Sequence, residues 1–583
     1  MDRYPGLNRR EALAAGGSLC LAATSAALPP KAKPGVSELV DRATRRRRAL
    51  RDSAIPPVTP EIADSNLPLN SHEGTLEAAA QSAALAAEAR RLAREPMSED
   101  DRDTLDGLLW DLDREAGYAR FYWHEFPLGY SGSQLAILGL LFPQPPAPLE
   151  PGAFVQKVRQ APAYVDAIRE RLNGQTRRDL TAPRAEGLRA YGQFMTEAKE
   201  AANAIHRKAG ALAANPGGTS AAKEARQIAD GPLAAALDRL GDTIRSDYIP
   251  VLGEQGKLAR AADAPDYFRE LGRLRIPEEL RIDESHQEAR YRLAVIDADL
   301  AQIRRRLGGP ADAAAFHRSM IGNPRWYVRN AEELRARLEA AIAQVTALVP
   351  HYFRSAPSTP FVVAPLPDAL QTRLLNGIYL PPSTASPRGT YLYNTTRLDI
   401  SNWAWTKALV SHELMPGHHL QFAMRFESKT LSPYRKELFI PGYGEGWGEY
   451  ARQLMEEAGL YDGDPWGLYA SRLQERRFVL RAMVETGVTD PRWTWQKADA
   501  ELATDPLTRP GTTRQIALSA ATFRSTGLLY WRGMRRFLGL RALAQSRAGP
   551  KFDIRDFHGL AMRGDFVPFS VAERRIHGFS AWG

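Results

Sequence analysis

The stretch His412-Glu413-Leu414-Met415-Pro416-Gly417-His418-His419 holds three of the 11 histidines of this 583-residue chain within eight positions. A glutamate directly follows the first histidine. In helical zinc sites, histidines at positions i and i+4 share one face and bind the metal, and the glutamate at i+1 acts as general base. The stretch therefore predicts a metal-binding helix with a catalytic glutamate.

The spacing of these histidines differs from that pattern. Pro416 occupies position i+4, and His418 and His419 stand at i+6 and i+7. On a straight helix i+6 points about 240° around the axis and i+7 lies about 10.5 Å along it, so neither would share an ion with His412. Because proline interrupts a helix, a two-residue bulge would bring His418 to the ligand position, and a three-residue bulge would bring His419. We expect His418 as the ligand, with His419 beside it or as a transition-state donor. The alternative is a Pro-Gly turn that carries surface histidines and no metal.

A second helix is predicted from Gly446 to Glu457, opened by the sequence Tyr443-Gly-Glu-Gly-Trp-Gly-Glu-Tyr450. Packed antiparallel to the first helix, it would supply Glu445 as a third ligand, and Glu449 would orient a ligand histidine. Both carboxylates also suit the first turn of an ordinary surface helix. The flanking glycines favour the metal interpretation, because they destabilise a helix unless something approaches closely. A His/His/Glu set suits Zn²⁺ best.

Most of the remaining chain has the apolar periodicity of helices, in residues 75–94, 103–119, 184–213, 220–242, 283–307 and after the capping box at Asn330–Glu333. Residues 361–363 and 389–394 are β-branched and aromatic and predict strands. The fold class we expect is mainly α, with a small β-sheet next to the metal-binding helix. We expect three regions: an export signal at 1–30, a helical region at 31–350 that forms one wall of a cleft, and a catalytic metal-binding region at 351–583.

The composition is that of a soluble globular protein, with 44% hydrophobic and 25% charged residues. The net charge of +9 is scattered along the chain, so we expect no binding of nucleic acid. The single cysteine, Cys20, excludes an intramolecular disulfide and a cysteine-ligated metal site. No segment after residue 30 reaches the roughly 18 apolar residues of a membrane span, so no stable membrane insertion is expected after signal removal. The sequence makes no prediction of an oligomeric state.

The first thirty residues predict an export signal. Arg9 and Arg10 precede a modestly apolar run rich in Ala and Gly, and residues 25–27 offer a cleavage site. This order resembles a twin-arginine signal and predicts a periplasmic or secreted protein. The alternative is an Ala-rich amphipathic helix on a cytosolic protein. A lipoprotein signal is not expected, because Leu19 stands where a small residue should precede the modified cysteine.

The motifs HELMPGHHLQ (412–421) and EGWGEY (445–450) resemble the HExxPGHH and EGWxxY signatures of a large bacterial family, domain of unknown function 885, in the zincin-like metallopeptidase clan. Residues 389–395, 484–488, 527–533 and 552–558 also resemble parts of that family. The resemblance implies a large helical zincin-like architecture, similar in plan to gluzincins and deep-cleft carboxypeptidases. It also implies His412, one of His418 and His419, and Glu445 as metal ligands, with Glu413 as the base.

Three further positions take their interpretation from the resemblance. Tyr530 matches a tyrosine that would act as oxyanion donor, and its alternative role is that of a core aromatic residue. Glu449 stands where the family commonly has an apolar residue, and Thr489 where a histidine is common. Neither is an expected primary ligand, so we expect metal binding to survive both departures. The loss of the histidine at position 489 would affect substrate binding or transition-state stabilisation.

The function we expect is zinc-dependent hydrolysis of peptide bonds, of carboxypeptidase or dipeptidase type. Glu413 would take a proton from zinc-activated water and deliver it to the leaving amine, while Tyr530 or His419 would stabilise the oxyanion. Hydrolysis of another amide or an ester, or a catalytically inactive periplasmic binding protein, are the alternatives.

The peptide substrate would meet two further groups of residues. A strand with Tyr391, Tyr393 and Asn394 would align it by β-augmentation, or else only fill the core. One of the arginines 388, 481 and 532 would bind its C-terminal carboxylate.

Overall fold

The structure is a computed structural model, and it is mainly helical, with 72% of the residues in helices and one small sheet. This confirms the expected fold class, mainly α with a small β-sheet. The structure describes residues 34–582 except for 51–66, 68–69, 130–132, 141–150, 215–216, 321–322, 324–325, 368–370, 372–376, 385, 397, 399–404, 509–510 and 523–526. The expected export signal and Cys20 lie outside the described residues.

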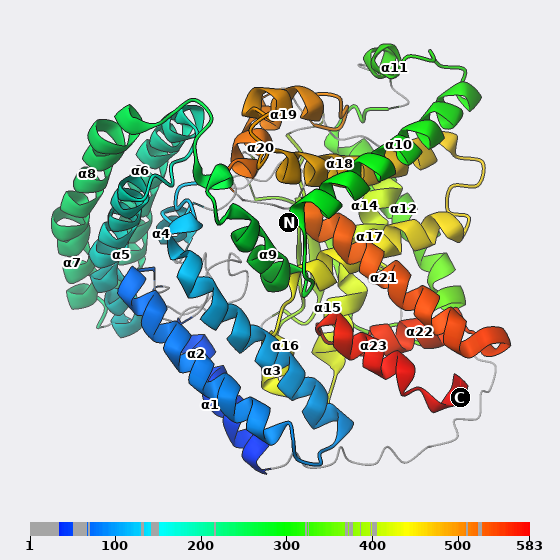
Figure 1. Ribbon diagram of the computed structural model, residues 1–583, viewed down its shortest axis with the longest axis horizontal. Helices are drawn as coiled ribbons and strands as arrows, with labels where there is room; N and C mark the ends of the chain where they lie inside the picture. Colours follow the sequence, from blue (N-terminus) through cyan, green and yellow to red (C-terminus); the bar gives the residue numbers. More distant parts are fainter. Residues whose placement is uncertain are drawn as a thin grey trace, which may run out of the picture.

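The first part of the chain forms helices up to residue 352. They are α1 (Pro34–Leu50), α2 (His72–Leu92), α3 (Glu99–Tyr118), α4 (Ala136–Leu140), α5 (Pro151–Arg177), α6 (Arg184–Ala213), α7 (Thr219–Ile228), α8 (Ala234–Asp242), α9 (Ala264–Arg275), α10 (Ile282–Arg306), α11 (Ala313–Met320) and α12 (Ala331–Tyr352). The Asn330 side chain caps α12 by accepting a hydrogen bond from the Glu333 amide at 2.8 Å, as the sequence predicts. Figure 1 shows α5–α8 side by side at one end of the molecule.

The second part follows a short sheet. Its helices are α14 (Thr406–Glu413), α15 (His418–Glu427), α16 (Pro433–Glu437), α17 (Pro441–Glu457), α18 (Pro465–Gly487), α19 (Trp495–Leu502), α20 (Thr512–Ala520), α21 (Gly527–Ala548), α22 (Ile554–Ala561) and α23 (Phe569–His577). α17 packs along α21, and both α14 and α21 pack on α18 (Figure 1). Helix α17 begins five residues before the predicted start, because Pro441 suits the first turn of a helix.

The sheet has three strands in the order β1-β3-β2: β1 (Phe361–Pro365), β2 (Gly377–Leu380) and β3 (Gly389–Tyr393). β1 runs parallel and β2 antiparallel to β3. The sequence predicts β1 and β3, whereas β2 has too few β-branched residues to stand out. The sheet lies just before α14 in the chain, so its residues can line the region around the motif.

Buried apolar side chains form two clusters. The smaller one lies within residues 67–252 and holds α4–α8 together. The larger one joins α1–α3 and α9–α12 to the helices after residue 400. The larger cluster thus includes side chains from both sides of residue 350, where a boundary between regions is predicted from the sequence.

Buried ion pairs also join the two parts of the chain. Arg575 binds Asp103 of α3 at 2.8 Å and Asp565 at 2.7 Å, and Asp565 also pairs with Arg435. All four side chains are almost fully buried. Such a network fixes α3 against α16 and α23, because each buried charge needs its partner.

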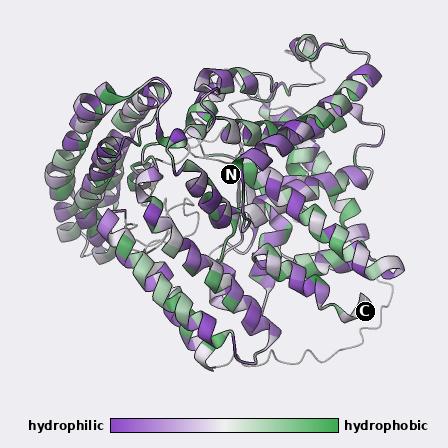
Figure 2. Ribbon diagram, in the orientation of Figure 1, coloured by the Kyte–Doolittle hydropathy of each residue, from purple (hydrophilic) through white to green (hydrophobic). Residues whose placement is uncertain are grey.

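Hydrophilic and hydrophobic residues interleave along the helices, as expected for amphipathic helices around a core (Figure 2). Among the described residues, no helix combines the length and the apolar character that crossing a membrane would require.

Candidate metal centre

The motif helix ends within the motif. α14 ends at Glu413, residues 414–417 form a turn with a cis Met415–Pro416 bond, and α15 begins at His418. The indole of Trp447 donates a hydrogen bond to the Pro416 carbonyl at 2.8 Å and joins this turn to α17. The expected bulge inside one helix is therefore a break between two helices, because Pro416 cannot continue the hydrogen-bond ladder.

Two glycines permit the close packing around His412. A Cβ on Gly417 would lie 1.8 Å from the His412 carbonyl oxygen, so the turn requires glycine there. A Cβ on Gly448 of α17 would lie 2.6 Å from Cε1 of the His412 ring. The ring thus lies directly on the backbone of α17, which accounts for a glycine in the interior of that helix.

Three side chains converge between α14, α15 and α17. The ligand atoms of His412, His418 and Glu445 all lie within 4.8 Å of one another. Oε2 of Glu445 is 3.5 Å from Nε2 of His412 and 3.4 Å from Nε2 of His418. Tetrahedral ligands at Zn–N and Zn–O distances of 2.0–2.1 Å are separated by about 3.4 Å. The donor types and these two spacings therefore fit a zinc ion.

The opposite nitrogen of each imidazole contacts an oxygen atom. Nδ1 of His412 lies 3.0 Å from Oε1 of Glu449, and Nδ1 of His418 lies 3.1 Å from Oε1 of Gln421. Nδ1 of His418 is within hydrogen-bond distance of the Gln421 oxygen, whereas Nδ1 of His412 lies beside the Glu449 carboxylate as an ion-pair partner. The Nε2 atom of each ring faces Glu445, so both imidazoles would offer Nε2 to a metal once they are deprotonated. Glu449 is thus placed where the sequence analysis expects an orienting carboxylate.

Glu449 is itself held by two buried groups. It is 1% exposed and accepts hydrogen bonds from Nε of Arg452 at 2.9 Å and from the Gln474 amide at 2.5 Å. Sequence reasoning missed Gln421, Arg452 and Gln474. The first two stand three residues after His418 and Glu449 on the same helices, which is the signal that could have found them.

The electrostatics reflect a crowded cluster of carboxylates and imidazoles. Burial lowers the pKa of His412, but Glu445 and Glu449 outweigh it and raise that pKa to about 10. Burial acts against ionisation of Glu445, yet the two histidines hold its pKa well below the usual range. In the same way Arg452 and His412 lower the pKa of Glu449 to about 2. Both carboxylates are therefore ionised and ready to stabilise a cation.

Glu413 and Tyr530 lie at the same cluster. Glu413 is half-buried and, within the part of the chain that the structure describes, forms no hydrogen bond. Burial raises its pKa. The Tyr530 ring lies between two others, stacked on Phe478 at 4.0 Å and 2° and on His412 at 5.9 Å and 25°. Burial and the charges of Glu445 and Glu413 raise the pKa of its phenol.

His419 faces the sheet instead of the cluster. Its Nε2 lies 3.0 Å from the Thr359 carbonyl oxygen, and its Nδ1 lies 2.9 Å from the Tyr379 hydroxyl. A carbonyl only accepts, so Nε2 carries the proton and Nδ1 accepts from Tyr379. Burial lowers the pKa of His419 to about 4. Both nitrogens are thus engaged, and the structure does not bring His419 to the metal-ligand side or leave it free as an oxyanion donor.

The expected substrate strand does not fit the sheet. β3 carries Tyr391 and Tyr393 and is paired on both edges, by β1 and β2, so it offers no edge for a peptide. Asn394 is 2% exposed, and its side chain binds the Gln371 carbonyl at 2.5 Å. β3 therefore has no free edge for β-augmentation in this sheet, and all three side chains are buried, so contact of these residues with substrate stays a prediction. Tyr391 still lies near the site, since Glu413 adds to burial in raising its pKa.

Thr489, at the position where the family commonly has a histidine, lies just beyond α18, and its hydroxyl donates a hydrogen bond to the Thr486 carbonyl at 2.7 Å.

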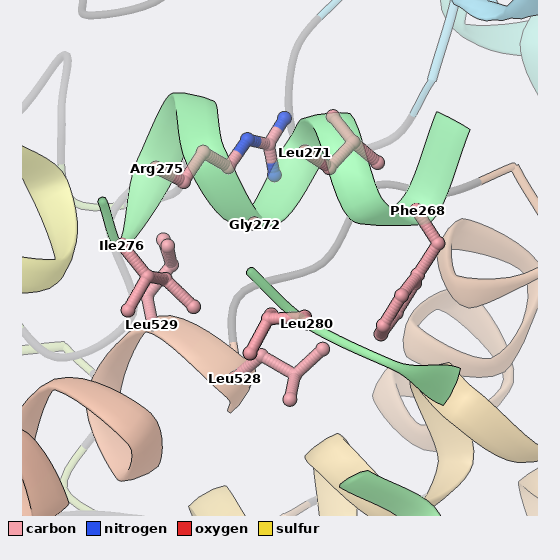
Figure 3. A pocket seen from close by; sticks show the side chains of 8 residues that line it. All are labelled: Phe268, Leu271, Gly272, Arg275, Ile276, Leu280, Leu528 and Leu529. Atoms are coloured by element: carbon pink, nitrogen blue, oxygen red, sulfur yellow. The ribbon is translucent and has the colours of Figure 1, made fainter. Parts of the chain in front are cut away.

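A small, partly open apolar pocket lies between α9 and the first turn of α21. Figure 3 shows Leu280, Leu528 and Leu529 facing the side of α9 that carries Gly272. Its lining includes none of the predicted site residues.

The chain belongs to the bacterial family of proteins of unknown function DUF885, whose family model matches residues 58–576. Two solved structures are similar in fold. One is a "putative lipoprotein" from Colwellia psychrerythraea, with a TM-score of 0.78, 18% identity, and coverage of 93% of this chain and 98% of that chain. The other is a "putative lipoprotein of unknown function" from Shewanella oneidensis, with a TM-score of 0.71, 15% identity and the same coverage. No curated protein matches the chain.

Proposed function

We propose that this member of the DUF885 family is a zinc-dependent hydrolase of peptide bonds, with a zincin-like catalytic centre. One observation carries the proposal: Nε2 of His412 and Nε2 of His418 face the same Glu445 oxygen at 3.5 and 3.4 Å. An ordinary ion pair needs only one imidazole for each carboxylate. Here two imidazoles face one oxygen of Glu445, and a second, half-buried glutamate, Glu413, lies beside them. Two imidazoles and a carboxylate as ligands, with a second glutamate as general base, are a donor set that catalytic zinc sites use.

Each residue has a role in this proposal. His412, His418 and Glu445 hold the ion, and Glu449 and Gln421 fix the two imidazole rings. Bound zinc supplies Lewis acidity and lowers the pKa of a bound water molecule.

The proton transfers belong to the chain's own groups. Glu413 accepts the proton of the attacking water and delivers it to the leaving amine. The phenol of Tyr530 keeps its proton, because its pKa is raised, and donates a hydrogen bond to the developing oxyanion. His419 has a positioning role, because its hydrogen bonds connect α15 to Tyr379 of β2 and to Thr359 before β1.

We also propose that the protein is exported. The arginine pair Arg9–Arg10 and the apolar run that follows support a twin-arginine-like signal. Both similar structures carry the description "putative lipoprotein", which fits proteins that function outside the cytoplasm. Fractionation of cells that express the full chain, with and without Arg9→Lys and Arg10→Lys, tests this proposal.

The function is tested by incubating purified protein with a peptide library of mixed length and identifying the products by mass spectrometry. We expect cleavage that a chelator abolishes and added zinc restores. Fragment lengths then separate carboxypeptidase from dipeptidase action. A zinc-loaded protein that cleaves no peptide would contradict peptidase activity. The same samples assayed on small amides and esters would then test the broader hydrolase.

A further inference from the structure

Helix α18 carries four arginines, and one of them differs from the others. Arg472 pairs with Glu456 at 3.0 Å, Arg476 with Asp297 at 2.6 Å, and Arg477 with Asp505 at 3.1 Å. Arg481 forms neither a hydrogen bond nor an ion pair with any residue that the structure describes, and its Nε is buried. Among the described residues, Arg481 therefore has no carboxylate within ion-pair distance, although Asp505 and Glu485 act on its charge from further away.

An unpaired charge of this kind is unfavourable. Removing a guanidinium from water costs free energy that only a partner anion or hydrogen-bond acceptors return. Burial and the neighbouring Arg477 lower the pKa of Arg481, which reflects this cost. A side chain kept in such a state is suited to a ligand that supplies the missing anion.

Arg481 lies beside the candidate metal centre. It follows Phe478 by one turn of α18, and Phe478 stacks face to face on Tyr530. The first residue of α21, Gly527, packs against Arg481, since a Cβ on Gly527 would lie 2.5 Å from Cβ of Arg481. Charges of the metal centre and of Arg481 both act on the phenol of Tyr530: the charge of Glu445 raises its pKa, and the charge of Arg481 lowers it. Arg481 thus lies on the helix that packs against Tyr530, close enough for its charge to act on the phenol.

We propose that Arg481 binds the C-terminal carboxylate of a peptide substrate, so that the enzyme cleaves close to a free C-terminus. This inference rests on the proposed function and specifies its substrate class. Guanidinium groups bind carboxylates through two parallel hydrogen bonds. The other two arginines named from the sequence are less suited: Arg532 already binds Glu278 and Glu288, and Arg388 is exposed. We therefore expect the scissile bond to lie close to the free C-terminus of the peptide.

The test compares three N-acetylated tetrapeptides on zinc-loaded enzyme: a free acid, its C-terminal amide, and the amide with a terminal aspartate. We expect a kcat/KM roughly 100-fold higher for the free acid, because an unpaired buried charge is left when the carboxylate is missing. Arg481→Met should remove this preference by lowering kcat/KM for the free acid, mainly through KM. Arg481→Lys should restore part of it. Arg476→Met, the matched control on the same helix, should retain the full preference.

Several results would overturn the inference. One is equal cleavage of acid and amide by the wild-type enzyme, and another is an unchanged preference in Arg481→Met. Cleavage of the aspartyl amide as fast as the free acid would assign the recognised anion to a side chain. A Tm of Arg481→Met well below that of the wild-type protein would show that Arg481 has a structural partner, whereas the unpaired charge predicts an unchanged or higher Tm.

Failure of the proposed function can be told apart from failure of this inference. If no peptide is cleaved, calorimetric binding of the same free acid and amide still tests Arg481. Binding that is selective for the acid and lost in Arg481→Met would support the carboxylate site without peptidase activity. Equal binding of acid and amide would contradict it.

Discussion

The carboxylate of Glu449 lies 3.0 Å from Nδ1 of His412, and the other nitrogen of the same ring lies 3.5 Å from Glu445. One imidazole thus connects two carboxylates on successive turns of α17. The inner carboxylate fixes the ring and its tautomer, and the outer one shares the space that a metal ion would occupy. This relationship gives Glu449 a definite role at a position where the sequence resemblance predicts an apolar residue.

Glu449→Gln should lower zinc affinity about 10- to 100-fold, because the ring loses the charged acceptor that orients it. Competition with a chromophoric chelator measures this change. Glu456→Gln is the matched control, since Glu456 also pairs with Arg452 but does not contact His412. Equal zinc affinities in the two variants would contradict the orienting role.

His418→Ala should lose zinc far more than His419→Ala. The first removes an Nε2 atom that lies 3.4 Å from Glu445, and the second removes two hydrogen bonds near the sheet. Metal content after dialysis against a weak chelator distinguishes them, with roughly a 100-fold or greater difference in affinity expected. The reverse order would move the ligand to His419.

Gly448→Ala should weaken zinc binding although alanine favours a helix. The added Cβ would lie within 2.9 Å of three atoms of the His412 ring, so the ring must shift. Gly539→Ala on α21 is the control, because a Cβ there meets no atom within 4 Å. It should leave metal binding unchanged and stabilise the protein by about 0.5–1 kcal/mol. Normal zinc affinity in Gly448→Ala would show that the ring does not depend on this contact.

The sequence predicts the helical fold, two of the three strands and the residues of the candidate metal cluster, because these follow from local periodicity and short motifs. It misplaces features that depend on long-range packing. The order of the strands puts β3 in the centre, which no local pattern encodes. The break at Pro416 is recognisable as an interruption, but its form depends on contacts such as the one from Trp447. The side to which His419 turns is set by Thr359 and Tyr379, which lie 60 and 40 residues away in the chain.

Asp565→Asn should destabilise the protein by about 3–5 kcal/mol at pH 7, because it leaves Arg575 and Arg435 without their shared partner. Burial opposes ionisation of Asp565, but Arg575 and Arg435 hold its pKa well below the usual range. A carboxyl with a depressed pKa in the folded state stabilises above its unfolded pKa of about 3.9. The difference between wild type and variant should therefore shrink as the pH falls below about 4.

Urea unfolding followed by circular dichroism at several pH values measures this difference. Asp113→Asn is the control, since Asp113 forms an exposed pair with Arg90 and should change stability by less than about 1 kcal/mol. A pH-independent difference for Asp565→Asn would contradict the assigned cause.

The most direct test of the account compares wild type and Glu413→Gln at equal zinc content, with peptide cleavage measured before chelation, after it, and after zinc is restored. We predict zinc-dependent cleavage by the wild-type protein and a loss of about 10²–10⁴-fold in Glu413→Gln with zinc still bound. Undiminished cleavage by the zinc-loaded variant, or cleavage that survives chelation, would contradict a zinc centre with Glu413 as its base.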